Sequence, residues 1–294
     1  FDLNYKLQSL GIKMIKNYKL ISFLIFIGQR IFFVRGSLKR FLNTYIHKLV
    51  NYDSSKDILE SRVGAVVGGV PFFFYFDGMS ETKQIFGSYN KKEIDFLKQN
   101  THTNSIFVDI GANIGFYTQN IASTYKRSSF SKIISIEPNP ILVKRLNDNL
   151  SLLQNIIPEI ENKIITENYA IGSTVGEIFL DLNEGYGNAR IIDDKKTTAI
   201  KVQIVTLLEL IKKHNIDYIT NLKIDVEGYE DRALKPFFEE APETLFPRNI
   251  VIEYTSQHEW EDKDFINYLI KKGYRLKIRT RGNLCLSLNT NNAH

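Results

Sequence analysis

The chain has 294 residues, which is enough for one large domain with an appendage or for two domains. Hydrophobic residues make up 43% and charged residues 24%, which is typical of a soluble globular protein, and no cluster of Cys and His suggests structural zinc. The single cysteine, Cys285, excludes an internal disulfide and fits a reducing compartment, so we expect the protein in the cytoplasm.

The net charge of +5 is unevenly distributed along the chain. Residues 1–50 carry nine Lys and Arg against one acid, Asp2, for a net charge of +8, so residues 51–294 sum to −3. A nucleic-acid-binding protein needs basic charge around its site, and here that charge lies in the N-terminal arm. We therefore expect no nucleic-acid partner.

Residues 1–50 have apolar positions at three-to-four spacing and are expected to form a helical arm. Within it, residues 20–34 are apolar except for Gln29-Arg30, a run that is too short and too interrupted for a membrane span. Two alternatives stay open: a helix that docks on the protein body, or a basic amphipathic helix in peripheral contact with a membrane surface. Because the sequence begins with Phe1 and not Met, we expect it to be trimmed at the N-terminus.

A small β-hairpin is expected over residues 61–77, where two apolar runs flank Gly68-Gly69. Its aromatic residues either line a core, which we favour, or form a lid over an acceptor together with Gly185–Asn188. These aromatic residues are Phe72, Phe73, Phe74, Tyr75 and Phe76. We place the domain boundary before the hairpin, between the arm at residues 1–58 and the main domain at residues 59–294.

From residue 106 onward, strands and helices alternate as in a parallel α/β sheet. The main strands are expected at 106–110, 132–137, 164–170, 219–225 and 249–254. Helices are expected at 91–99, 114–125, 138–154, 206–214, 229–238 and 261–272. A polar hairpin is expected at 175–182, and an antiparallel strand pair at 274–280 and 284–288. This α/β layout resembles the Rossmann-like sheet of class I methyltransferases with its terminal antiparallel strand pair.

The run from Phe107 to Phe116 is an apolar strand that ends in an acid, Asp109, turns on glycine and opens a helix. Such a turn places backbone N–H groups and a carboxylate beside a small ligand. In the dinucleotide fingerprint G-x-G-x-x-G the middle glycine makes room for a pyrophosphate, but the three positions here hold Gly111, Asn113 and Phe116. The turn therefore predicts a nucleoside-like ligand without phosphates, S-adenosylmethionine, and disfavours a nicotinamide dehydrogenase.

Charged residues cluster at the carboxyl ends of the expected strands, where ligands bind in open α/β sheets. They are Asp109, Glu137, Lys223, Asp225 and Glu253. Glu137 lies near the distance from Gly111 at which an acid accepts from ribose hydroxyls. Asp109 is expected to receive either backbone N–H groups of the glycine turn or the amino group of the ligand. Asn168 and Ala170, after the third strand, are expected to flank the adenine.

The segment from Leu222 to Glu230, LKIDVEGYE, resembles the K-I-D-V-E-G-x-E motif of the FkbM family of S-adenosylmethionine-dependent methyltransferases. Other motifs of the family follow in its order, at residues 107–117, 136–140, 168–172 and 252–253. The resemblance covers roughly residues 60–288 and adds Gly115, Pro138 and Asn139 to the expected cofactor-binding residues. It implies a Rossmann-like fold, methyl transfer from S-adenosylmethionine, and usually an oxygen acceptor on a natural product or a surface-polysaccharide sugar.

Two mechanisms are open for the end of the fourth strand, where Asp225 and Glu227 lie beside the expected methyl position. In the first, Asp225 or His258 is the general base for the acceptor hydroxyl, and Lys223 is an ion-pair partner that holds the carboxylates in place. In the second, Asp225 and Glu253 ligate Mg²⁺ or Mn²⁺, which lowers the pKa of the acceptor hydroxyl. We favour the metal-free mechanism because Lys223 would neutralise one of the acids.

We therefore expect an O-methyltransferase that acts on a hydroxyl of a sugar or glycan precursor in surface polysaccharide biosynthesis, in the cytoplasm or at the membrane surface. The alternatives are a natural-product O-methyltransferase and, from another class, a non-catalytic S-adenosylmethionine-binding scaffold. The intact motif at residues 223–230 argues against a scaffold, because buried charges are costly to keep without a role. An RNA methyltransferase is disfavoured by the negative net charge of residues 51–294.

Overall fold

The computed structural model describes residues 18–30, 41–42, 44–46, 62–75, 83–86, 90–125, 130–182, 190–192 and 199–289. The chain divides into two compact units, each of which is described by itself. Unit 1 comprises residues 1–91 and 148–156, and unit 2 comprises residues 92–147 and 157–294. The predicted boundary between residues 58 and 59 falls outside the described ranges and stays a prediction.

Unit 1 contains a helix, a β-hairpin and a short 3-10 helix, namely α2 (Tyr18–Arg30), β1 (Arg62–Val67), β2 (Val70–Tyr75) and η2 (Lys83–Phe86). The predicted hairpin is confirmed, and it turns at Gly68 and Gly69, which both have the positive φ that a tight two-residue turn requires. Every residue of β2 is buried, so the aromatic residues at 72–75 line the core of this unit. Phe76 and Gly185–Asn188, the rest of the alternative lid, lie outside the described residues.

The predicted helical arm is confirmed where the structure describes it. Helix α2 covers residues 18–30, and residues 41–42 and 44–46 are also helical. In the described part of the chain, no helix combines the length and the apolar composition that a membrane crossing needs.

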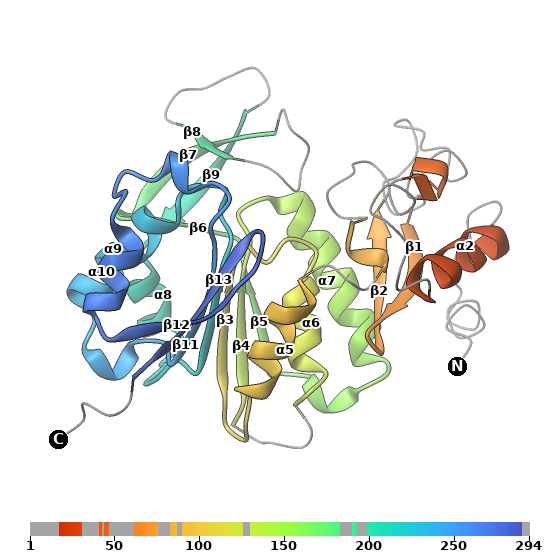
Figure 1. Ribbon diagram of the computed structural model, residues 1–294, viewed down its shortest axis with the longest axis horizontal. Coiled ribbons are helices and arrows are strands. Elements are labelled where there is room, and N and C mark those ends of the chain that lie inside the picture. The colour runs from red at the N-terminus through yellow and green to blue at the C-terminus, as the bar shows by residue number, and fades with distance from the viewer. Residues whose placement is uncertain are drawn as a thin grey trace. The chain divides into compact units, whose positions relative to one another are not determined.

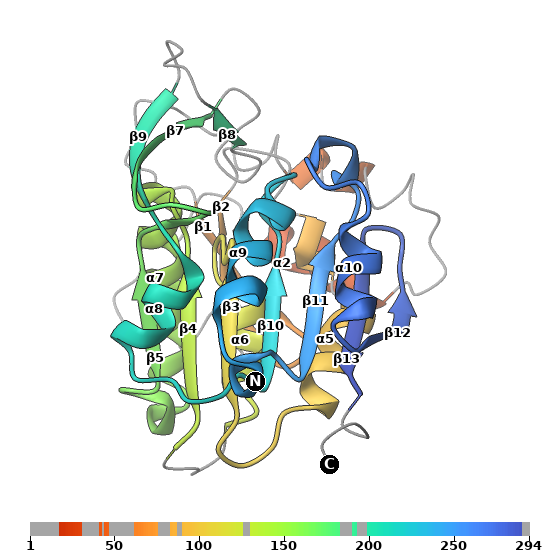
Figure 2. The same ribbon diagram turned by 90° about the vertical axis from the view of Figure 1, so that its left-hand side faces the viewer.

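Unit 2 is built on a seven-stranded sheet with the order β12-β13-β11-β10-β3-β4-β5 (Figure 2). The strands are β3 (Ile106–Ile110), β4 (Lys132–Ile136), β5 (Ile164–Glu167), β10 (Asn221–Ile224), β11 (Asn249–Glu253), β12 (Tyr274–Arg279) and β13 (Asn283–Leu288). The first five pair in parallel, and β13 runs antiparallel to both β11 and β12. The predicted Rossmann-like sheet, with its terminal antiparallel strand pair, is confirmed.

Helices lie on both faces of this sheet: α8, α9 and α10 on one, and α5 and α6 on the other (Figure 1). The α-helices that follow the arm are α5 (Lys91–Gln99), α6 (Phe116–Ala122), α7 (Pro140–Gln154), α8 (Leu207–Lys213), α9 (Glu230–Glu240) and α10 (Phe265–Lys271). Short 3-10 helices are η3 (Pro158–Ile160), η5 (Glu243–Leu245) and η6 (Gln257–Glu259). Alternate strand residues such as Ile110, Leu222 and Ile250 pack against α8–α10 in one apolar core. The intervening residues, which include Asp109 and Lys223, point to the opposite face.

The order of the strands reverses between β3 and β10. From β3 the chain continues outward through β4 and β5, and from β10 it continues through β11 in the other direction. Ligands of open α/β sheets bind beyond the carboxyl ends of the strands at such a switch point. The two strand ends approach closely there, because a Cβ added at Gly111 would lie 1.9 Å from the carbonyl oxygen of Asp225.

The third predicted strand, at 164–170, is too long. Strand β5 ends at Glu167, and β6 (Ala170–Ile171) belongs to a separate four-stranded sheet with the order β6-β9-β7-β8. Two predicted helices are also shorter than expected: α6 begins at Phe116, because Asn113 and Gly115 adopt positive φ, and α10 begins at Phe265.

The residues at 175–182 do not form a hairpin of their own. They contribute one strand, β7 (Gly176–Asp181), which pairs with β8 (Arg190–Ile192) and β9 (Ala199–Val205). Sequence patterns did not predict β8 and β9, whose residues are mostly exposed or half-buried and so lack a clear apolar face. Figure 2 shows β7, β8 and β9 beyond the carboxyl ends of the central strands.

Candidate active site at the carboxyl edge of the sheet

Asp109 lies in β3, is fully buried, and supports the start of helix α6. Its Oδ2 accepts hydrogen bonds from the backbone N–H (3.1 Å) and from the Oγ1 hydroxyl (2.7 Å) of Thr118. This backbone N–H lies in the first turn of α6 and has no partner within the helix. Burial raises the pKa of Asp109, whereas Lys223 and the hydrogen bonds from Thr118 lower it. The N–H of Gly111 donates to the carbonyl of Ile136 instead (2.9 Å). Contact of Asp109 with a ligand amino group stays a prediction.

Lys223 faces Asp109 in the register of β10 and β3, and its side chain is nearly buried. Its Nζ donates to the carbonyl oxygen of Gly111 (2.7 Å). The same Nζ lies 3.7 Å from Oδ1 of Asp109 and 3.8 Å from Oδ2 of Asp225. Lys223 thus lies between two acids, Asp109 of β3 and Asp225 after β10. This position suits the predicted role of an ion-pair partner that holds the carboxylates in place.

Hydroxyl groups complete this buried network, and they were not predicted from the sequence. The Oγ1 of Thr118 lies 2.7 Å from the Oγ of Ser135, which is buried in β4 and pairs in register with Asp109. A signal was present, because Ser135 is a polar residue among the otherwise apolar residues 133–136 of a strand that is covered on both faces.

Glu137 follows β4 and contacts the glycine turn from the side. Its Oε2 accepts the N–H of Asn113 and its Oε1 accepts the N–H of Asn139, both at 2.9 Å. Burial raises the pKa of Glu137 to about 7, although these two N–H groups oppose the shift. A carboxylate offers about four acceptor positions, so both oxygens keep capacity for ribose hydroxyls. Asn168, expected near the adenine, donates through Nδ2 to the carbonyl oxygens of Glu137 and Pro138, both at 2.8 Å.

The five consecutive backbone N–H groups of residues 111–115 all donate to acceptors within the protein. The acceptors are the carbonyl oxygens of Ile136 and Ala112 and the side-chain oxygens of Glu137 and Asn113. A phosphate-binding turn presents such N–H groups to the phosphate oxygens instead. This geometry supports a ligand without phosphates at the turn.

The remaining residues predicted to bind the cofactor lie in or beside these elements. Gly115 precedes α6 with a φ of 87°, and a Cβ there would lie 2.4 Å from Leu146 of α7. Phe116 begins α6 and is buried. Ala170 begins β6 and packs in the small core of the four-stranded sheet with Ile204. Their contacts with a cofactor stay predictions.

Beyond β10, the segment 225–228 forms a tight turn with unusual backbone geometry. Glu227 has a φ of 54° and Gly228 a φ of 100°. A glutamate in this region costs on the order of 1–3 kcal/mol, and such strain gathers at functional sites. Burial, together with the charges of Asp225 and Glu253, raises the pKa of Glu227 to about 7, and the charge of Arg190 opposes this shift.

Glu230, the first residue of α9, is fully buried and holds this turn. Its Oε1 accepts the N–H groups of Val226 (2.9 Å) and Gly228 (3.3 Å), and its Oε2 accepts from Nε1 of Trp260 (2.6 Å). Burial raises the pKa of Glu230 to about 7 against these donors. Glu230 closes the motif at residues 222–230, but sequence analysis assigned it no role, because its partner Trp260 is distant in the sequence.

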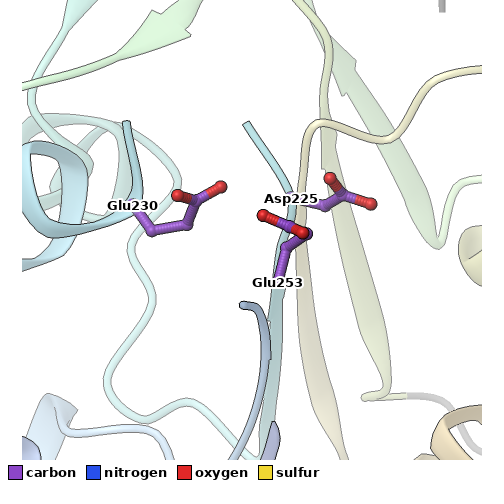
Figure 3. A group of neighbouring side chains, drawn as sticks. All are labelled: Asp225, Glu230 and Glu253. Atoms are coloured by element: carbon purple, nitrogen blue, oxygen red, sulfur yellow. The ribbon is translucent and has the colours of Figure 1, made fainter. Parts of the chain in front are cut away.

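Asp225, Glu230 and Glu253 form a group of three carboxylates at this edge. One oxygen of each lies within 4.8 Å of the others. Figure 3 shows the carboxylates of Glu230 and Glu253 pointing toward each other, with Asp225 beside Glu253. Burial raises the pKa of Glu253, which ends β11 and accepts the N–H groups of Thr255 and Ser256.

The donor set of this group suits a hard divalent cation such as Mg²⁺ or Mn²⁺, which prefers carboxylate oxygens. Protein N–H groups nevertheless already occupy part of the acceptor capacity of Glu230 and Glu253. The ammonium group of Lys223 also adjoins Asp225. The metal site predicted at Asp225 and Glu253 stays a prediction, and Glu230 is its additional candidate ligand.

His258 lies in η6 and is predominantly exposed. Its Nε2 is 3.1 Å from Oε1 of Glu259. The predicted role of His258 as the general base stays a prediction.

Residues 109–276, more than half of the chain, match the family profile described as the methyltransferase FkbM domain. No curated protein matches the chain in sequence.

Several solved structures are similar to the chain. The crystal structure of methyltransferase FkbM from Methylobacillus flagellatus KT is 20% identical with a TM-score of 0.40, over 64% of this chain and 44% of that chain. A putative O-methyltransferase from Klebsiella pneumoniae is 8% identical with a TM-score of 0.42, over 90% and 95% of the two chains. M. jannaschii TYW2 in complex with AdoMet is 16% identical with a TM-score of 0.38, over 80% and 85%. The match spans less than half the length of the Methylobacillus protein.

Proposed function

The chain belongs to the FkbM methyltransferase family, and from this premise we propose that it transfers a methyl group from S-adenosylmethionine to a hydroxyl of a sugar or glycan precursor. The proposal rests on one observation: the candidate cofactor-binding residues and the candidate catalytic acids follow neighbouring strands at the same edge of the sheet. Glu137 and the glycine turn follow β4 and β3, and Asp225 and Glu227 follow the adjacent β10.

The residues at the glycine turn fit S-adenosylmethionine. Glu137 keeps acceptor capacity on both oxygens for ribose hydroxyls. The N–H groups of residues 111–115 are satisfied within the protein, which suits a donor that carries no phosphate. When bound, S-adenosylmethionine supplies an electrophilic methyl group on a sulfonium.

Asp225 and Glu227 are the candidate bases for the acceptor. An alcohol has a very high pKa, so a carboxylate that takes its proton as the oxygen reacts contributes typically 10²–10⁴-fold to the rate. Lys223 lies 3.8 Å from the Asp225 carboxylate, and Glu230 fixes the turn that carries Glu227. We assign Lys223 and Glu230 to the positioning of these bases.

A metal-assisted version of the reaction uses the same residues. Asp225, Glu230 and Glu253 would hold Mg²⁺ or Mn²⁺, and the cation would lower the pKa of the acceptor hydroxyl. We favour the metal-free version because Lys223 neutralises part of the charge of Asp225. Activity that survives EDTA would support the metal-free version, and activity that is lost in EDTA and restored by Mg²⁺ would contradict it.

The choice of a sugar acceptor is supported by the resemblance to FkbM enzymes and by the chemistry of this edge. Carboxylates such as Asp225, Glu227 and Glu253 accept hydrogen bonds from the several hydroxyls of a sugar ring. We place the reaction in the cytoplasm, where nucleotide sugars would be the available precursors. A natural-product hydroxyl offers the same reacting group and is the alternative acceptor.

The test begins with the donor and continues with the acceptor. S-adenosylhomocysteine should raise the melting temperature of the full chain, and NAD should not. Incubation with labelled S-adenosylmethionine and a panel of nucleotide sugars, read by mass, should then give one methylated product. The variant Asp225→Asn should lose most of this activity, whereas Asp217→Asn, at an exposed position before β10, should retain it.

Each failure has a distinct meaning. The absence of any shift with S-adenosylhomocysteine contradicts the methyl donor and, with it, the whole proposal. A shift without a methylated sugar contradicts the acceptor class and directs the panel to natural products with free hydroxyls.

A further inference from the structure

Helix α2 is attached to unit 1 along one face. Ile21 and Ile25 are buried, and the side-chain Nε2 of Gln29 donates to the carbonyl oxygens of Val66 (2.9 Å) and Ile85 (2.8 Å). These contacts join the helix to the hairpin and to η2. The helix therefore docks on the protein, as the first of the two alternatives for the arm predicts.

The opposite face of α2 is apolar as well. Leu20, Phe23 and Phe26 follow one another at three-residue spacing and are 43%, 57% and 50% exposed. Residues at this spacing share one face of a helix. Nearby in the sequence, Phe41 and Tyr45 stack on each other and are also exposed. Large apolar groups that gather on an exposed face mark a second contact surface.

The charge of the arm indicates which kind of partner binds the exposed face of α2. Residues 1–50 carry nine Lys and Arg against one acid, and these basic residues lie before, within and after α2 in the sequence. Aromatic residues on one face together with abundant Lys and Arg are typical of helices that lie on anionic membranes. A second copy of the chain is a poorer partner, because two arms of the same strongly positive charge repel each other.

We propose that the exposed face of α2, at Leu20, Phe23 and Phe26, docks on an anionic phospholipid surface while the buried face stays on unit 1. The helix has 13 residues, which at 1.5 Å per residue is about 20 Å, shorter than a hydrocarbon core of about 30 Å. It lies on the membrane and does not cross it. The two alternatives for the arm are thus compatible, since each uses a different face of one helix. This docking does not depend on methyl transfer.

Vesicle flotation of the full chain tests the proposal. The chain should float with vesicles of phosphatidylcholine and phosphatidylglycerol, and much less with vesicles of phosphatidylcholine alone. The double variant Phe23→Ser, Phe26→Ser should reduce binding to the anionic vesicles by about tenfold or more, because two half-exposed aromatic rings no longer enter the lipid. The matched control is Ile270→Ser, Leu276→Ser, which removes two comparably exposed apolar residues from unit 2 and should bind like the wild type.

A second measurement needs no variant. Amide hydrogen exchange of the wild type should slow over residues 18–30 when anionic vesicles are added, and not when neutral vesicles are added. The proposal is overturned if the wild type binds neither kind of vesicle or if both double variants bind equally well. It is also overturned if light scattering shows self-association that Phe23→Ser, Phe26→Ser abolishes while vesicle binding is absent, since the occupant would then be a second copy.

Discussion

Lys223 is a single residue on which several parts of the candidate site depend. Its ammonium group is buried beside Asp109 and also contacts Asp225 and the carbonyl of Gly111. Replacing it with Met leaves a buried carboxylate without its cation, a change that typically costs 3–5 kcal/mol. We expect Lys223→Met to lower the free energy of unfolding by about 3 kcal/mol at pH 7, measured by urea denaturation and circular dichroism.

The matched control for this variant is Lys235→Met, which removes a more exposed partner, that of Asp262. Such surface pairs contribute at most about 1 kcal/mol, so the control should change stability by less than this amount. The double variant Lys223→Met, Asp109→Asn should recover part of the loss because the unpaired charge is gone. An equal effect of the two lysine variants would contradict the proposed network.

Glu137 provides a second prediction at this scale, for binding of the product S-adenosylhomocysteine. Its pKa is raised to about 7, and the charged carboxylate is the better acceptor for ribose hydroxyls. The charged form prevails above pH 7 and is lost as the pH falls through the pKa. We therefore expect the affinity to fall by up to about tenfold per pH unit below pH 7, measured by calorimetry at pH 6, 7 and 8.

The variant Glu137→Gln separates this effect from other titrations. It should bind S-adenosylhomocysteine more weakly at pH 8 and lose most of the pH dependence, because its amide does not titrate. Unchanged affinity in Glu137→Gln would remove Glu137 from the ribose site.

At the scale of elements, apolar runs and turn residues predicted most of the fold. Strand β3 and helix α5 have the predicted bounds, because an apolar run or a charged flank marks each end. Helix α7 begins at Pro140, within the predicted start at residues 138–140, and ends at Gln154 as predicted. Strands β8 and β9 were not predicted, because their residues are mostly exposed or half-buried and lack a clear apolar face. Residues 164–170 divide between two sheets because β6 pairs with β9, a strand that the sequence did not predict.

For the candidate site, too, one part could be predicted from the sequence and another could not. Its place could be predicted, because acids such as Asp109, Glu137 and Asp225 all follow parallel strands whose carboxyl ends share one edge. The contacts within the site could not be predicted, because they join different segments of the chain. The backbone N–H of Thr118 donates to Asp109, and Nε1 of Trp260 donates to Glu230. His258, which was predicted from its proximity in the sequence to Glu253, has an exposed side chain, and its role stays a prediction.

The turn between β3 and α6 gives a prediction for an element. Gly111 has a φ of 72°, and a Cβ there would lie 1.9 Å from the carbonyl oxygen of Asp225. We expect Gly111→Ala to lose at least about 2 kcal/mol of stability, through strain and displaced backbone, and to lose the thermal shift with S-adenosylhomocysteine. The control is Gly176→Ala, where an added Cβ meets nothing within 4 Å and both properties should persist. Tolerance of alanine at Gly111 would show that the two strand ends can separate.

At the scale of the whole molecule, we propose separate tasks for the basic arm and for the acidic edge of the sheet. The net charge of +8 in residues 1–50 suits an anionic surface, whereas the acids of residues 51–294 concentrate in part at the sheet edge. Because the acids at this edge are buried together, they lower the free energy of unfolding of the chain. A site that keeps such costly groups is expected to use them.

The last prediction concerns the pH dependence of that stability. The pKa values of Glu137, Glu227 and Glu230 are raised from 4.5 to about 7 in the folded chain, mainly by burial. Between these values the folded state holds protons that the unfolded state has released, so the free energy of unfolding should fall as the pH rises from about 4.5 to 7. Urea midpoints at pH 5, 6, 7 and 8 measure this fall. Glu227→Gln, which cannot ionise there, should match the wild type near pH 5 and exceed it at pH 8. A wild type that gains stability over this range, or a variant that is weaker at pH 8, would mean that these acids are stabilised as carboxylates by the fold.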